Sequence, residues 1–240
     1  MSTFLELCNI VRAQSGISGQ GPSSVENQVG IMSDVVRWTT EAYNKIQTMH
    51  ENWNFLHNQF TFELQAGLST YNPSLIVGSN NGVGVRTPTK DTFIIQQTNT
   101  NKEKTRLRYV PWSVWQIDEK RLNVDEVRQP TMYTEDPSGV YHFYPSEQAQ
   151  INPLDNINHT ITFQGYARPH VMTVNNDIPA IPEQYQELIK MEALIRYAEF
   201  YNSPEVYKSA ALMFQEGIKK MEYSELPREN LRTPTLVHFA

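Results

Sequence analysis

The sequence predicts an α+β fold: a helical bundle built from N- and C-terminal helix pairs, with an antiparallel β-sandwich or barrel-like domain inserted between them. Apolar residues recur at helical spacing near both ends of the 240-residue chain, and alternating apolar and polar residues occupy its middle. This length suits one large domain or two small ones. We expect residues 1–57 to form the N-terminal helices, 58–178 the β domain, 179–226 the C-terminal helices and 227–240 an extended tail.

Two amphipathic helices are predicted near the N-terminus. Thr3 and Glu6 form a capping box, which predicts the start of the first helix. Its apolar face is predicted to consist of Phe4, Leu7, Cys8 and Val11. Gly and Ser are frequent in residues 16–24, which predicts a loop before a longer helix from about Asn27 to His50. The apolar stripe of this second helix comprises Ile31, Val35, Trp38, Ala42, Ile46 and Met49.

A strand-rich region follows these helices. Phe60, Phe62 and Leu64 alternate with polar residues, which is typical of a half-buried strand. Further strands are predicted at Thr92–Thr98, Thr105–Val110, Val140–Tyr144 and Thr160–Tyr166. Turn-forming residues separate these short strands, so we expect a small antiparallel sandwich or barrel.

The helical period returns at Pro182 and continues through two predicted helices. The first has an apolar stripe of Tyr185, Leu188, Met191, Ile195 and Ala198. Ser203, Pro204 and Glu205 predict the start of the second helix, with Ser203 as its cap. Its stripe comprises Tyr207, Ala211, Phe214, Ile218 and Met221. Neither terminal helix pair can bury its apolar face alone, so we expect all four helices to pack together.

The sequence shows no pattern that supports catalysis, so we expect no enzymatic activity, metal or cofactor. Cys8 cannot form an internal disulfide and is predicted to be a packed thiol, because it lies on an apolar helix face. The six histidines stand singly, without metal-ligand spacing. Gly82 and Gly84 lack the lysine and helix of a phosphate-binding loop and predict a hairpin turn. An enzyme whose site is assembled from distant residues is the least favoured hypothesis.

One basic run allows two interpretations. Lys102, Lys104, Arg106 and Arg108 would share one face if this segment were a single strand. The run would then be either a charged edge strand that blocks aggregation or a contact with DNA phosphates or an acidic partner. The formal net charge of −6 argues against a general duplex-binding protein. No apolar run reaches the ~18 residues of a membrane span, so we expect no membrane partner.

Two tryptophans, Trp112 and Trp115, lie close together and are predicted to be core residues or a contact with another subunit or the tail. They also support an alternative function. A carbohydrate- or peptide-binding module on the β domain would use aromatic stacking surfaces, with Trp112, Trp115, Tyr141 and Tyr144 as candidates.

Several short segments occur in a recognisable order along the chain. They are Thr3–Leu7 leading to Gly21–Ser23, Val36–Trp38 through Ile46–Gln47, Trp53–Leu56, Arg128–Tyr133, Val140–Pro145, Asp177–Pro182, Leu188–Ile189 and Tyr197–Ala198. With helices flanking a strand-rich insert, these segments resemble the head–tail adaptor (connector) proteins of tailed bacteriophages, including the tail tubular protein A type. The resemblance spans most of the chain.

The resemblance implies a non-enzymatic structural protein of the virion, made in the host cytoplasm and located at the head–tail interface. Such adaptors form rings, usually dodecamers, which dock beneath the portal protein and present a platform to a tail or nozzle protein. Passive contact with packaged DNA is also expected. We expect the C-terminal tail to become ordered on the portal through Leu231, Thr233, Pro234, Leu236, Val237 and Phe239.

Overall fold

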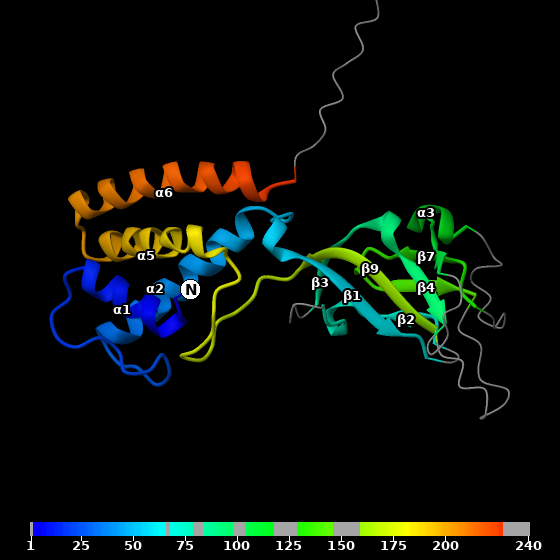
Figure 1. The fold of residues 1–240 in the computed structure, drawn as a ribbon, viewed down its shortest axis with the longest axis horizontal. Coiled ribbons are helices and arrows are strands. Elements are labelled where there is room, and N and C mark those ends of the chain that lie inside the picture. The colour runs from blue at the N-terminus through cyan, green and yellow to red at the C-terminus, as the bar shows by residue number, and fades with distance from the viewer. Residues whose placement is uncertain are drawn as a thin grey trace, which may run out of the picture. The chain divides into compact units, whose positions relative to one another are not determined.

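The computed structural model describes residues 2–65, 68–78, 84–97, 104–117, 129–145 and 159–227. Helices and sheets are both present, which confirms the predicted α+β class (Figure 1). The chain divides into two compact units. The helical unit takes residues up to Ile46, Asn52–Phe55 and the residues from Thr173 onward, and the β unit takes Gln47–Glu51 and Leu56–Met172.

The first two helices follow the sequence prediction closely. Helix α1 (Phe4–Gln14) begins with the predicted capping box: Thr3 Oγ1 accepts from the Glu6 N–H at 3.3 Å, and the Glu6 carboxylate accepts from the Thr3 N–H at 2.9 Å. Helix α2 (Ile31–Met49) begins four residues later than predicted. Gly30 has a φ of 61°, a left-handed backbone that ends the preceding loop. The buried residues of α1 are those predicted: Phe4, Leu7, Cys8 and Val11.

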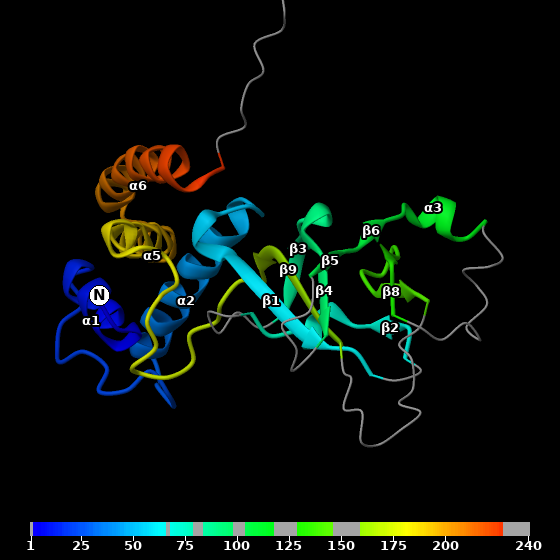
Figure 2. The ribbon, with the colours of Figure 1, turned by 45° about the vertical axis from the view of Figure 1, so that its right-hand side comes forward.

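Helix α5 (Glu187–Phe200) lies at the centre of the helical unit. It follows a short 3₁₀ turn, η4 (Glu183–Tyr185), and lies between α6 (Pro204–Glu225) and the α1–α2 pair, as Figures 1 and 2 show. It is therefore buried on more than the single stripe that the sequence predicted. Its buried residues are Leu188, Ile189, Met191, Glu192, Ala193, Leu194, Ile195 and Ala198.

Helix α6 buries one face against α5. The buried residues on this face are Ala210, Phe214, Ile218 and Met221. Tyr207, which was predicted to join this stripe, is 44% exposed. Ser203 is the N-cap residue, as predicted, and its carbonyl accepts from the Tyr207 N–H at 3.0 Å, but its side chain makes no capping hydrogen bond. Pro204 at the first turn and the acidic Glu205 mark the helix start, as expected from helix geometry and dipole.

The β unit contains two sheets. In the first, the strand order is β1–β9–β4–β5, and β3 also pairs with β9. These strands are β1 (His57–Glu63), β3 (Val85–Pro88), β4 (Ile94–Gln97), β5 (Thr105–Arg106) and β9 (His159–Ala167). Strand β3 approaches β9 closely at Gly165, where a Cβ atom would lie 2.8 Å from the Thr87 carbonyl oxygen.

The second sheet has the order β2–β8–β7–β6. Its strands are β2 (Thr70–Tyr71), β6 (Arg108–Tyr109), β7 (Met132–Glu135) and β8 (Tyr141–Tyr144). Strands β6 and β7 are parallel, whereas the sequence predicted antiparallel pairing throughout. Sandwich and barrel were both predicted. The described strands form two sheets and no closed barrel, so the structure shows the sandwich. The short helix η1 (Asn54–Leu56) precedes β1, and three others lie between strands: η2 (Pro73–Leu75), η3 (Lys90–Thr92) and α3 (Trp112–Trp115).

The predicted strand Thr105–Val110 is interrupted at Leu107, where the chain crosses from one sheet to the other. Strand β5 pairs with β4 in the first sheet, and β6 pairs with β7 in the second. Leu107 between them is 3% exposed, and its N–H donates to the Phe93 carbonyl at 2.9 Å. The apolar residue at the crossing therefore enters the core that the sheets share.

Stacked aromatic rings fill the core between the two sheets. The Phe93 ring lies 4.2 Å from the Phe163 ring of the first sheet and 4.0 Å from the Tyr133 ring of the second, measured between centroids. Both pairs are stacked. Burial raises the pKa of the Tyr133 and Tyr141 hydroxyls, which therefore stay protonated in the core.

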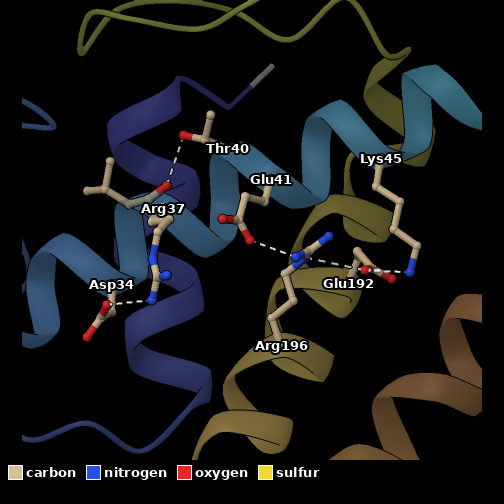
Figure 3. Close-up of polar contacts among 8 residues, drawn as sticks. Asp34, Arg37, Thr40, Glu41, Lys45, Glu192 and Arg196 are labelled. Atoms are coloured by element: carbon tan, nitrogen blue, oxygen red, sulfur yellow. Dashed lines mark hydrogen bonds and ion pairs between the residues drawn. The ribbon is translucent and has the colours of Figure 1, made fainter.

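A buried carboxylate links α2 to α5 in the helical unit (Figure 3). Glu192 is 1% exposed, and its Oε1 atom lies 2.7 Å from Lys45 Nζ and 3.5 Å from Arg196 Nε. Arg196 also pairs with Glu41 at 2.6 Å. A carboxylate this deeply buried is tolerated only beside cations, because desolvation of an unpaired charge costs several kcal/mol. The network therefore fixes the α2–α5 packing.

Replacing Arg196 with Met should destabilise the helical unit by about 2–4 kcal/mol, because the Glu192 carboxylate keeps only Lys45 as a close cation. The melting temperature should fall by roughly 5–10 °C, measured by circular dichroism.

The matched control for this prediction is Arg37→Met. Arg37 pairs with Asp34 at 2.8 Å, but its side chain is 53% exposed, so the loss should stay within about 1 kcal/mol. Equal destabilisation by the two substitutions would contradict the assigned role of the buried network.

Candidate interaction surfaces

The basic run occupies the edges of both sheets. Arg106 lies in β5 and Arg108 in β6, each the last strand of its sheet in the described part of the chain. Lys104 precedes β5 and is exposed, whereas Lys102 lies outside the described residues. Arg106 and Arg108 therefore lie at sheet edges in the described part of the chain, but in two different strands and not in the single strand that was predicted. Their role in blocking aggregation stays a prediction. Contact of this run with DNA or an acidic partner stays a prediction.

The outer face of the first sheet is a shallow polar hollow of about 650 Å³ beside the basic edge. Pairing across the strands places Thr61, Thr162, Ile94 and Arg106 in one row. The hydroxyls of Thr61 and Thr162 lie 3.4 Å apart, and Arg106 reaches Asp91 at 3.6 Å. The remaining lining residues include Gln59, Gln96, Lys104 and Gln164. Amides, hydroxyls and a few cations can bind an anionic or hydrogen-bonding surface.

Helix α3 covers part of the outer face of the second sheet. The Trp112 ring lies 5.1 Å from the His142 ring, measured between centroids, and Trp115 is 3% exposed. Tyr141 is fully buried in the core. Two of the four candidate stacking residues, Trp115 and Tyr141, therefore offer no open ring face to a sugar or peptide. Any subunit or tail contact at α3 would use Trp112 with Val114 and Ile117, which are 49% and 81% exposed.

A carboxylate–histidine pair lies next to Trp112. Asp136 Oδ2 is 3.1 Å from His142 Nε2, and its Oδ1 accepts from the Ser138 and Val140 N–H groups at 2.8 and 3.0 Å. Burial alone would raise the pKa of the Asp136 carboxyl, but these hydrogen bonds outweigh it and lower the pKa. The neighbouring Glu135 carboxyl has its pKa raised, chiefly by burial. Glu135 at the end of β7 and Asp136 in the turn after it therefore have pKa shifts of opposite direction.

The titratable groups in the described residues gather at no metal-binding or nucleophilic centre. No group of three or more His, Cys, Asp or Glu residues in the described part of the chain could hold a metal ion. Cys8 is fully buried, which raises the pKa of its thiol to about 12, so it is a packed thiol as predicted. Among the described helices, none is both long and apolar enough to cross a membrane.

Sequence reasoning missed the exposed apolar residues of the helical unit. Leu212, Met213 and Tyr223 of α6 are each more than half exposed. The sequence analysis left these three residues outside the predicted buried stripe of this helix but did not identify them as an exposed apolar surface. The predicted portal-binding residues of the tail lie outside the described residues.

Glu135 at the end of β7 and Asp136 directly after it are predicted to respond oppositely to replacement by a neutral amide. The folded pKa of Asp136 is lowered, so its carboxylate stabilises the fold above its ordinary pKa, and this stability is lost as pH falls through the folded value. Glu135 has a raised folded pKa, so its favourable contribution is lost as pH rises through that value. At about pH 7, Asp136→Asn should cost about 1 kcal/mol, and Glu135→Gln should stabilise the protein by less than that.

Thermal melts at about pH 7 and about pH 3 test this pair of substitutions. The difference in melting temperature between each variant and the parent protein should be smaller at the lower pH, because both acids are then protonated in the unfolded chain. Effects of the same sign at neutral pH would contradict the assignment.

The family comparison agrees with this architecture of helices flanking a β unit. The model of the SU10 adaptor protein family matches residues 2–236, which span both units. A search of curated proteins finds no match. The family match supports a structural adaptor of a phage, as the sequence resemblance implied, while the narrower likeness to the tail tubular protein A type stays a prediction. The chain belongs to the SU10 adaptor protein family.

Proposed function

We propose that this adaptor forms a ring beneath the portal of a tailed phage and joins the DNA-filled head to the tail. The family match over residues 2–236 is the observation that carries this proposal. A dodecamer is the oligomer proposed, with the portal on one side and a tail or nozzle protein on the other. The role is structural and needs no catalytic residue or cofactor.

The proposed ring explains the composition of the C-terminal segment. Residues 227–240 come after α6, which ends at Glu225, and contain Leu231, Leu236, Val237 and Phe239. One such segment can make only a few apolar contacts. Twelve copies on one ring would bind a symmetric partner at high effective concentration, so that weak single contacts give durable attachment.

The basic edge is proposed to face packaged DNA. Lys104 and Arg106 border the polar face of the first sheet, where cations can contact phosphates. Asp91 partly compensates Arg106, and the chain as a whole is acidic. The contact should therefore be weak and independent of DNA sequence. Both properties suit a ring through which DNA of any sequence must pass.

Deleting residues 231–240 should abolish capture of the adaptor by the portal protein of the same phage. The apolar contacts of the tail would be lost, while both units keep their cores. Capture is measured by co-sedimentation and by electron microscopy of the mixture.

The control is a full-length chain in which the four apolar residues of this segment are replaced by Ser. It should fail in the same way, with an unchanged circular dichroism spectrum and melting temperature. Normal capture by both altered proteins would refute the tail's role. Absence of any ring with the intact protein would refute the proposed function itself.

Replacing Lys104 and Arg106 with Glu should weaken binding to duplex DNA at low salt. Each lost phosphate contact should reduce the slope of log K against log salt by about 1. Fluorescence anisotropy at several salt concentrations measures this. The charge-matched control replaces both Lys208 and Lys219, which are exposed on α6, with Glu and should have little effect. Unchanged DNA binding by the variant with Lys104 and Arg106 replaced would refute the proposal that this basic edge contacts DNA.

A further inference from the structure

Asp91 is the acid that faces the basic edge of the first sheet. Its Oδ1 atom lies 3.6 Å from an Nη atom of Arg106. The Asp91 side chain is 87% exposed and the Arg106 side chain is 63% exposed, so water reaches both ends of this ion pair. An exposed pair of this kind contributes little to stability, because solvent screens the two charges. Arg106 can therefore exchange Asp91 for another anion without damage to the fold.

The segment that carries Asp91 is fixed to both sheets. Asp91 lies in η3, where the Thr92 hydroxyl accepts from the Gln164 N–H of β9 at 2.9 Å. The Tyr133 hydroxyl of β7 donates to the carbonyl of Lys90. Because these bonds hold the backbone on either side of Asp91, its carboxylate stays within reach of Arg106.

Lys90, the residue before Asp91, has a different partner. Its Nζ atom donates to the Tyr109 hydroxyl at 3.1 Å and lies 4.6 Å from the centre of the Tyr109 ring. Tyr109 belongs to β6 of the second sheet, whereas Arg106 belongs to β5 of the first. Lys90 therefore pairs at the second sheet and leaves the Asp91 carboxylate to Arg106.

The polar hollow beside this pair carries a small positive charge. Its charged lining residues are Lys104, Arg106 and Asp91, which are two cations and one acid. Glu63 at the end of β1 shares the outer face of the sheet by strand alternation, but it does not line the hollow. A carboxylate and a phosphate bind a guanidinium in the same way, through charge-assisted hydrogen bonds to their oxygen atoms. Asp91 and a DNA phosphate would therefore compete for Arg106.

We propose that Asp91 is a built-in competitor that releases DNA from Arg106. Arg106 exchanges Asp91 for a phosphate when DNA approaches, and Asp91 pairs with Arg106 again when the phosphate leaves. Exchange between two similar anions changes the free energy little, so the basic edge attracts DNA without holding it. This inference rests on the DNA contact proposed above for this edge and adds the means by which the contact is released.

Asp91→Asn in the full-length protein tests this role, because it removes the charge and keeps the size of the side chain. Fluorescence anisotropy at low salt measures binding to a duplex DNA of mixed sequence. The Kd should fall about fivefold, which corresponds to about 1 kcal/mol, the upper end for an exposed ion pair. Most of this change should appear as slower dissociation, measured by stopped flow.

Two controls separate competition at Arg106 from other effects of the lost charge. Asp34→Asn removes the same charge and also frees an exposed arginine, Arg37, but it lies in the helical unit, so DNA affinity should not change. Equal gains from both substitutions would reflect net charge alone and overturn the proposal. In an Arg106→Gln background, Asp91→Asn should give no gain. A gain that persists there would show that Asp91 repels DNA without acting through Arg106, which also overturns the proposal.

The DNA contact and its release can fail separately. If replacing Lys104 and Arg106 with Glu weakens DNA binding but Asp91→Asn changes neither affinity nor dissociation, the edge binds DNA and Asp91 is not a competitor. If neither variant differs from the parent protein, the edge does not contact DNA and both proposals are refuted. Ring assembly on the portal is a separate measurement, and neither result decides it.

Discussion

The burial of α5 is the constraint on which the helical unit depends. This helix lies between α6 and the α1–α2 pair, so most of its sides are buried against neighbouring helices. One of its buried residues is Glu192, whose carboxylate would be expensive to desolvate without Lys45 and Arg196 beside it. Once this packing is fixed, α6 has a single face to bury, and its outer side remains available to another molecule.

In the β unit, the segment that connects β5 to β6 contributes to the core between the two sheets. The chain passes through Leu107 from the edge of the first sheet to the edge of the second, so a single buried leucine joins the two sheets. Both edge strands are two residues long and carry an arginine, features that discourage uncontrolled strand pairing. The sheet face beside them is lined by neutral amides and hydroxyls, which suits transient, water-mediated contact.

These features fit an adaptor that acts through surfaces. In the β unit, the sandwich core takes Phe60, Phe93, Tyr133, Tyr141, Phe143 and Phe163, and Trp115 of α3 is buried as well. Exposed apolar residues occur in both units, for example Leu212 and Tyr223 in the helical unit and Val114 and Ile117 in the β unit. A structural adaptor that contacts other virion components needs exposed surfaces for them, and both units carry exposed apolar residues.

The sequence by itself determined the features that depend on neighbouring residues. The capping box at Thr3, the buried stripe of α1 and the alternating strand around Phe60 were all predicted, because local spacing and hydrogen bonding specify them. Only the tertiary structure decided that α5 is central, that the chain changes sheets at Leu107 and that Trp112 packs on His142. Each of these depends on contacts between residues distant in sequence, which periodicity within one segment does not encode.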